Sequence, residues 1–255
     1  MGQGLENVRR IYLEGIAGGN ARAAVEAYTG HRYTQHSTGV GDGAEGFLAF
    51  FEPFVERNPK REIEIVRILE DGPWVFCSAY QSLNDGEAQW VTMDLFYTDA
   101  DGLILEHWDT IAPFVPQAQS GEPMVGGTAV VDTSADGAAN KALVLEYTKQ
   151  VRQERQTTRV GEFVSDDLIQ HSAPIAAGRD GLETWLTSPA AGSYEMLFQL
   201  IGQGDTVVTY GKRHAGGQDI AVFDVYRVAG GLIVEHWMNE EVISPREAWG
   251  NSGKF

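Results

Sequence analysis

The chain has 255 residues, of which 43% are hydrophobic and 22% charged, a composition typical of folded globular proteins. Its formal net charge of −17 argues against nucleic acid or an anionic membrane as a partner, because phosphate binding needs clustered Lys and Arg. A single cysteine, Cys77, excludes an intrachain disulfide and a cysteine-rich zinc site. Met1–Arg10 lacks the apolar core of a secretory signal, and no run reaches 18 apolar residues, so we expect a cytoplasmic protein.

The first 115 residues predict three helices followed by four strands. Apolar residues recur with helical spacing between Leu5 and Ala17. Asn20 is placed to cap a second helix that runs to Tyr28, and a third is expected over 43–55. The strand-like runs lie near 61–70, 73–83, 88–98 and 103–115. They are separated by hairpin-turn residues such as Asn84-Asp85-Gly86, so helices precede an antiparallel meander, which is typical of an α+β fold.

The rest of the chain repeats this order after an irregular stretch. Residues 116–137 are rich in Gly, Ser, Ala and Pro, have no period, and predict a linker. Helices are then expected near 138–156, 158–164 and 178–187, and strands near 194–202, 205–213, 218–228 and 232–243. We therefore predict one domain over 1–115 and a second over 138–255.

Short motifs show that the two halves are copies. Tyr33-Thr34-Gln35-His36-Ser37 is echoed by Leu168-Ile169-Gln170-His171-Ser172. Met93-Asp94-Leu95-Phe96 is echoed by Phe223-Asp224-Val225-Tyr226. The run from Gly102 to Trp108 returns as Gly231 to Trp237, with six of seven positions identical. Because the motifs keep their order about 130 residues apart, they indicate duplication of a whole domain rather than a solenoid, whose repeats span about 20–50 residues.

These motifs, with a Gly-x-x-Gly that opens a helix, resemble the nuclear transport factor 2-like fold and, within it, the SnoaL-like polyketide cyclase family. The resemblance implies two tandem, cone-shaped α+β barrel domains, in which helices pack on a curved antiparallel sheet around a small-molecule pocket. Domains of this fold usually pair through their sheets. The resemblance therefore implies an internal pseudo-dimer with Trp108 and Trp237 buried between the copies, and it leaves further homo-oligomers open.

Alternation along the last strand of the first copy sorts its candidate pocket residues. His107, Asp109 and Ile111 share one face, whereas Glu106 and Trp108 take the other. Similarity to the steroid isomerases of this fold implies that the first face lines the pocket. It also places His36 where those enzymes have their base, and Asp94 where they have an acidic oxyanion donor. The first pocket is thus predicted to hold His36, Asp94, His107 and Asp109.

That set suits proton abstraction next to a carbonyl group. A neutral histidine is a good general base near pH 7, and a carboxyl group in an apolar cavity stays protonated and can donate to an enolate oxygen. Two structural interpretations stay open: Asp94 and His107 as a mutually satisfied buried couple, and His36 as a residue that bonds a loop backbone. No spacing typical of metal ligands is present, so we expect neither a metal nor a cofactor.

The second copy differs at two positions. Met238 stands where the first copy has Asp109, and Arg227 stands where it has Tyr97. The second pocket is predicted to contain His171, Asp224, His236 and Arg227. Tyr80 and Tyr210 lie on mid-sheet strands and are possible pocket donors whose facing is left open. Because a thioether cannot replace a carboxylate in proton transfer, we expect chemistry in the first pocket and a more apolar second one.

Two functions fit these observations. One is a cofactor-independent acid/base enzyme of the cyclase, isomerase or lyase type, acting on a small, mostly apolar carbonyl compound in an enclosed pocket. The other is a non-catalytic small-molecule binding protein that uses the same pockets. Four ionisable groups in the first pocket favour the enzyme, because a pure binding pocket needs few of them.

Overall fold

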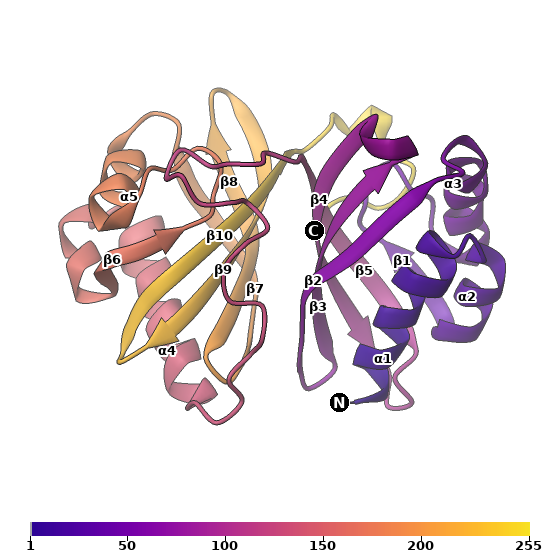
Figure 1. Cartoon of the computed structure of the whole chain (residues 1–255), viewed down its shortest axis with the longest axis horizontal. Helices are drawn as coiled ribbons and strands as arrows, with labels where there is room; N and C mark the ends of the chain where they lie inside the picture. The colour runs from indigo at the N-terminus through magenta and orange to yellow at the C-terminus, as the bar shows by residue number, and fades with distance from the viewer. Residues whose placement is uncertain (1) are drawn as a thin grey trace. The chain divides into compact units, whose positions relative to one another are not determined.

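The computed structural model describes residues 2–255, which divide by their contacts into two compact units. Unit 1 comprises the chain up to Pro113 together with Ile243–Phe255, and unit 2 comprises Phe114–Val242. Each unit is a five-stranded sheet with helices on one face (Figure 1). This confirms the predicted α+β class. Over these residues, no helix is both long and apolar enough to cross a membrane.

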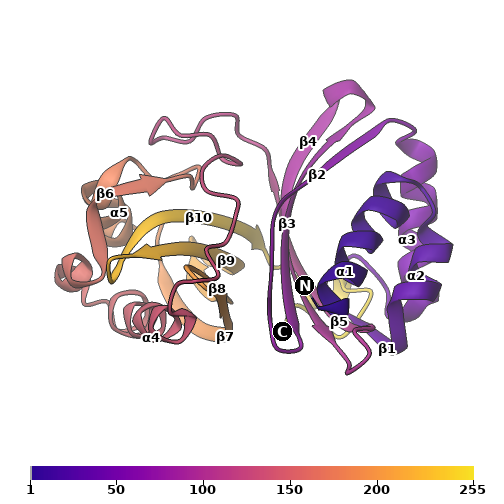
Figure 2. The ribbon, with the colours of Figure 1, turned by 60° about the horizontal axis from the view of Figure 1, so that its bottom comes forward.

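Unit 1 begins with helices and continues into a meander. Its helical elements are α1 (Gln3–Arg10), the π-helical segment η1 (Ile11–Ala17), α2 (Ala21–Tyr28), α3 (Gly43–Arg57) and the short 3-10 turn η2 (Asn84–Gly86). Its strands are β1 (Thr29–Gln35), β2 (Arg61–Asp71), β3 (Trp74–Leu83), β4 (Ala88–Thr98) and β5 (Ile104–Pro113). Helices α1, α2 and α3 lie together on one face of the sheet (Figure 2).

Unit 2 repeats this plan. Its helical elements are α4 (Gly137–Tyr147), the π-helical η3 (Thr148–Gln153), the 3-10 helix η4 (Thr157–Glu162) and α5 (Gly178–Thr187). Its strands are β6 (Val164–Gln170), β7 (Ser193–Gln203), β8 (Thr206–Ala215), β9 (Gln218–Ala229) and β10 (Leu232–Val242). A last 3-10 turn, η5 (Arg246–Ala248), follows within the part of the chain that joins unit 1.

The sheets have matching strand orders, β1-β5-β4-β3-β2 and β6-β10-β9-β8-β7. Hairpins connect the four meander strands of each unit, which are therefore antiparallel, and none departs from its predicted bounds by more than two residues. The expectation of a wholly antiparallel sheet is wrong for the fifth strand. β1 runs parallel to β5, and β6 parallel to β10, because a helix and three strands separate each pair along the chain.

The Gly-x-x-Gly motif allows a close approach of backbone at the start of α3. Gly43 has a φ of +77°, which favours glycine. A Cβ atom on Gly46 would lie 2.2 Å from the carbonyl carbon and oxygen of Gly41, so the preceding loop passes directly against the helix. Unit 2 repeats the device, since a Cβ on Gly181 would lie 2.2 Å from Ala176 O.

We expect Gly46→Ala to lower the free energy of unfolding by about 1–3 kcal/mol, because the added methyl group must displace backbone rather than a flexible side chain. Urea denaturation followed by circular dichroism measures the loss. Gly39→Ala is the matched control, since nothing lies within 4 Å of its added Cβ, and it should change stability by less than about 0.5 kcal/mol. Equal losses for the two variants would contradict the steric explanation.

The units observed differ from the predicted domains at both joins. The linker was predicted over 116–137, and residues 114–136 indeed contain no helix or strand. They nevertheless pack on unit 2, where Trp237 Nε1 donates to Gly126 O at 3.0 Å. Residues 243–255 pack on unit 1, where Asn251 Nδ2 donates to Ser37 O at 2.6 Å. The chain therefore passes from unit 1 to unit 2 after β5 and returns after β10. Pairing of the two sheets as a pseudo-dimer stays a prediction.

Candidate functional site

A cavity of about 300 Å³ lies between the helices and the sheet of unit 1. Its walls are mostly apolar and aromatic: Ile11, Ile16, Val40, Phe47, Phe50, Phe51, Phe54, Trp90, Phe96 and Ile111. Phe50 and Ile111 are 38% and 42% exposed, whereas most of the other wall residues are buried or half-buried. The cavity therefore opens through an apolar mouth, which suits an apolar ligand.

Three ionisable side chains from two neighbouring strands line the same cavity. Asp94 on β4 is paired in register with Asp109 on β5, and His107 stands two residues before Asp109. Because side chains alternate along a strand, all three point toward the helices. Each offers one potential metal-ligand atom, and these atoms lie within 4.8 Å of one another.

Asp94 and His107 are joined by a hydrogen bond that a glutamine completes. His107 Nδ1 lies 2.8 Å from Gln35 Oε1, an acceptor, so Nδ1 carries a proton. His107 Nε2 lies 2.9 Å from Asp94 Oδ1, and one proton is shared between these two atoms. Burial raises the pKa of Asp94, and this outweighs the lowering by His107. Asp94 Oδ2 is buried with no hydrogen-bond partner among the described residues.

Asp109 is held by a cation from a distant part of the chain. Lys254 Nζ lies 2.8 Å from Asp109 Oδ1, and the side chains are 1% and 7% exposed. Burial would raise the pKa of Asp109, but the charges of Lys254 and His107 bring it below its usual range. The distances among Asp94, His107 and Asp109 would admit a metal ion. However, the Lys254 ammonium already neutralises the charge of Asp109, one of the three candidate ligands.

His36 does not join this group, so the predicted placement of the base is wrong. β1 is in register with β5 as Gln35 opposite His107, and Gln35 therefore takes the pocket face while His36 points away. The His36 ring stacks on Trp108 at 4.5 Å, and Nδ1 donates to Gly253 O at 2.7 Å. This is the loop-bonding alternative, with the 243–255 segment as the loop.

Two predicted members of the second pocket lie on the other face for the same reason. His171 stacks on Trp237 at 4.8 Å, and its Nδ1 donates to Pro123 O at 2.7 Å. Arg227 Nε donates to Glu235 Oε2 at 2.7 Å on that face. Their assignment to the pocket is therefore wrong, whereas Trp108 and Trp237 lie on the outer face as expected and are buried.

The two tyrosines with open facing also point away from the cavity. β3 contributes Gln81 to the cavity wall, so its neighbour Tyr80 takes the opposite face, where its hydroxyl accepts from Gln89 Nε2 at 2.6 Å. Tyr210 on β8 stacks on Phe223 at 4.2 Å. Neither tyrosine is a pocket donor.

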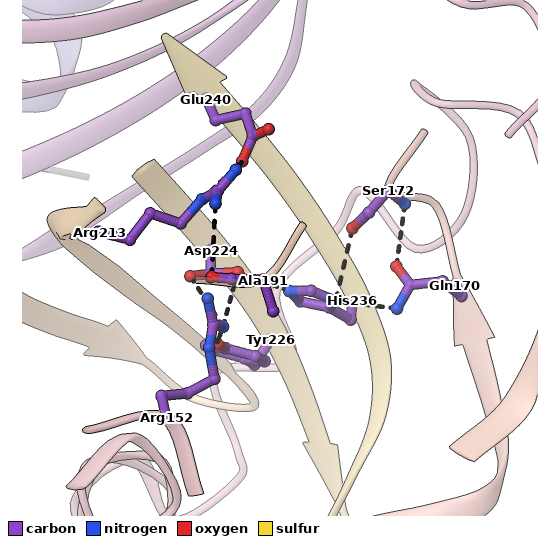
Figure 3. Close-up of polar contacts among 9 residues, drawn as sticks. All are labelled: Arg152, Gln170, Ser172, Ala191, Arg213, Asp224, Tyr226, His236 and Glu240. Carbon is purple, nitrogen blue, oxygen red and sulfur yellow. Dashed lines mark hydrogen bonds and ion pairs between the residues drawn. The ribbon is translucent and has the colours of Figure 1, made fainter. Parts of the chain in front are cut away.

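In unit 2, Asp224 and His236 form the matching pair, but a buried arginine satisfies the aspartate (Figure 3). Arg152 Nη1 lies 3.2 and 3.3 Å from the two carboxylate oxygens of Asp224. Ser172 N donates to Gln170 Oε1, which fixes the orientation of the Gln170 amide group. Gln170 Nε2 therefore faces His236 Nδ1 and donates to it at 3.0 Å. The other ring nitrogen of His236 therefore donates to Asp224, and the ring is neutral.

The pKa directions agree with this assignment. Burial lowers the pKa of His236 more than Asp224 raises it. Burial would raise the pKa of Asp224, but Arg152 and His236 bring it below its usual range. In unit 1 one proton is shared between Asp94 and His107, whereas in unit 2 the corresponding proton belongs to His236.

A second arginine lies at the place that corresponds to the mouth of the unit 1 cavity. Arg213 is 4% exposed and pairs with Glu240 at 2.6 Å (Figure 3). By strand register these residues match Gln81 and Ile111 of unit 1. The guanidinium carbons of Arg152 and Arg213 lie 5.4 and 5.9 Å from the Trp185 ring. The expectation of a more apolar second site is therefore wrong, although Met238 does lie in the hydrophobic core.

The residues of these sites that were not predicted include Gln35, Arg152 and Lys254. Gln35 had a signal, because it recurs as Gln170 within the repeated motif. Arg152 had no such signal, because aligning Tyr12 with Tyr147 places it opposite Ala17, which does not line the unit 1 cavity. Lys254 had none, since it follows the last predicted strand and lies 145 residues from its partner.

Comparison with known proteins identifies the first unit. Residues 8–107 match the family model of the SnoaL-like domain. Unit 1 is a SnoaL-like domain. Unit 2 repeats its strand order and its Asp–His pair, so the chain carries two units of this nuclear transport factor 2-like architecture in tandem. No curated protein matches the chain.

Solved structures similar to this chain each cover less than half of it. A Bacillus cereus ATCC 10987 protein described as a polyketide cyclase is 18% identical, with 43% of this chain and 74% of that chain covered and a TM-score of 0.38. A Jannaschia sp. CCS1 protein described as a SnoaL-like polyketide cyclase is 23% identical, with 43% and 85% covered and a TM-score of 0.37. A Kribbella flavida DSM 17836 protein described as a ketosteroid isomerase is 15% identical, with 44% and 85% covered and a TM-score of 0.39.

Proposed function

We propose that unit 1 is a cofactor-independent acid/base enzyme of the cyclase, isomerase or lyase type, acting on a small, mostly apolar carbonyl compound. The observation that carries this proposal is the Asp94–His107 pair, which shares one proton at the wall of an apolar cavity. A group that both accepts and returns a proton is what abstraction next to a carbonyl requires. The aromatic walls select apolar substrates by burying their surface.

In the proposed step, the pair starts as the Asp94 carboxylate and the His107 imidazolium. Asp94 Oδ2 takes a proton from the carbon next to the carbonyl, and the electrons of the broken C–H bond pass to the carbonyl oxygen as an enolate. The buried Tyr12 hydroxyl, which lines the cavity, donates to that oxygen. Burial raises the pKa of Tyr12 well above its ordinary value, so it keeps its proton.

The atom that receives the proton from Asp94 then determines the reaction class. Its return from Asp94 to a different carbon gives isomerisation. If the enolate carbon instead attacks a second carbonyl carbon of the same substrate, a C–C bond closes and the new alkoxide takes the proton, which gives cyclisation. Both outcomes balance without an oxidant or a cofactor.

For unit 2 we propose a non-catalytic role. Both oxygens of Asp224 contact Arg152, and His236 donates to Asp224 rather than sharing a proton with it. The ion pair of Arg213 with Glu240 occupies the position that is the mouth in unit 1. Loss of catalysis on substituting Asp224 but not Asp94 would reverse this ranking of the units.

Deuterium exchange tests the enzyme proposal without knowledge of the natural substrate. The probe is 2-tetralone, a small apolar ketone, incubated with the protein in D₂O and followed by proton NMR. We expect catalysed exchange next to the carbonyl, and a loss of about 10²-fold or more in Asp94→Asn, which cannot accept the proton. Tyr80→Phe, altered on the opposite face, should exchange at the wild-type rate. Saturable binding of the ketone without exchange by the wild-type protein would favour the binding-protein alternative.

A further inference from the structure

The segment 243–255 contacts the loop that lines one side of the unit 1 cavity. Asn251 Nδ2 donates to Ser37 O at 2.6 Å and to Val40 O at 2.8 Å. Gly250 N donates to Thr38 O at 2.8 Å. Since Ser37 and Val40 line the cavity, the segment holds the loop that closes it on this side.

The segment 114–136 contacts unit 2 in a matching way, and comparing the two segments shows what the segment 243–255 adds to unit 1. His36 donates to Gly253 O and His171 donates to Pro123 O, each at 2.7 Å, and each histidine stacks on the matched tryptophan. The repeated histidines are thus docking points for segments that follow the last strand of the other unit. In unit 1 the docked segment also places the Lys254 ammonium beside Asp109. Unit 2 has Met238 at the position of Asp109.

We propose that Lys254 is a positioning residue of the unit 1 site, which anchors the Asp109 carboxylate beside the proton-sharing pair of Asp94 and His107. The inference rests on the proposed function, because it assigns a part in that site. A buried ammonium 2.8 Å from a buried carboxylate keeps the carboxylate charged and fixes its position. Asp109 in turn lies in register with Asp94, so its charge acts directly on the pair.

The groups that face Asp109 define what loss of Lys254 would do. They are Asp94 on β4, His107 on β5, Ser37 on the loop after β1, and Lys254. With Lys254 present, one carboxylate is paired and the other shares a proton with histidine, so the cluster is neutral overall. Without the ammonium, a second carboxylate charge would remain in a buried site, and the cluster would take up a proton at a higher pH than it does with Lys254 present.

Carbon NMR of protein labelled with [4-¹³C]aspartate tests this without any substrate. In Lys254→Met the Asp109 carboxyl signal should titrate at a pH about one to three units higher than in the wild type. Lys254→Gln, which keeps a donor but not the charge, should behave likewise and serves if the methionine variant does not fold. Lys254→Arg should titrate as the wild type. Arg246→Gln removes the same charge from an exposed residue of the same segment and should leave the Asp109 signal unchanged.

Exchange into 2-tetralone supplies the functional arm. The pH profile of exchange should move to higher pH in Lys254→Gln and return in Lys254→Arg. If the wild-type protein shows no exchange, the proposed enzyme function fails while the NMR titration still tests the anchoring role. An Asp109 signal that titrates at the wild-type pH in a folded Lys254→Gln variant would overturn the inference.

Discussion

Replacing Arg152 with methionine is expected to lower the free energy of unfolding of unit 2 by about 3–5 kcal/mol, because removing one partner of a buried ion pair leaves a charge without compensation. The side chains of Arg152 and Asp224 are 3% and 0% exposed. The guanidinium also donates to the Tyr226 hydroxyl at 3.3 Å. Once it is lost, Asp224 keeps His236 as its partner, and that ring is neutral.

Urea denaturation measures this loss, and amide hydrogen exchange along β9 and β10 locates it in unit 2. The double variant Arg152→Met with Asp224→Asn removes both charges and leaves an amide oxygen to accept from His236, so it should recover most of the stability. Arg179→Met is the control, because its partner Asp166 is 75% exposed and such a pair contributes about 1 kcal/mol or less. A loss below about 1 kcal/mol for Arg152→Met would show that the pair does not stabilise the unit.

The meanders were predictable because strands and hairpin turns are encoded locally. Alternating apolar residues and Gly- or Asp-rich turns specify each strand within a few residues of itself. The same alternation placed His107 and Asp109 on one face, and the comparison with steroid isomerases added Asp94; all three line the cavity. The parallel pairing of β1 with β5 joins segments about 70 residues apart, and no local pattern specifies it.

The site was harder to predict because its remaining members depend on long-range geometry. β1 is a short edge strand whose register shifts between Thr29 and Thr34, so the facing of His36 follows from its pairing with β5. The comparison with steroid isomerases placed His36 in the pocket. Alternation along the strand puts Gln35 and His36 on opposite faces, so only one of them could line the pocket. Arg152 lies in a π-helical segment, where the usual helical spacing of inward positions no longer applies.

Stability at low pH should depend strongly on Glu235 of unit 2. Its side chain is 1% exposed and accepts from Arg227 Nε at 2.7 Å, from Thr128 N at 3.0 Å, and from His171 Nε2 at 3.0 Å. Burial opposes ionisation, but these donors lower the pKa of Glu235 from 4.5 to about 2. A carboxylate whose pKa is lower in the folded state stabilises it above pH 4.5, and this contribution disappears as the pH falls toward 2.

This lowering of the Glu235 pKa corresponds to about 3 kcal/mol of stability at neutral pH, since each pKa unit is worth about 1.4 kcal/mol. Glu235→Gln should lose about that much stability at pH 7 and show a flatter dependence between pH 4.5 and 2, measured by urea denaturation at each pH. The matched residue of unit 1 is the control: Glu106 is 20% exposed and contacts Arg32, which is 48% exposed, so Glu106→Gln should cost less than about 1 kcal/mol. Gly127 lies against this cluster, since a Cβ there would be 2.1 Å from Glu235 Oε1, so protonating Glu235 should also loosen the 114–136 segment. Hydrogen exchange of that segment that stays slow at low pH would separate its docking from Glu235 and limit the carboxylate to a role within β10.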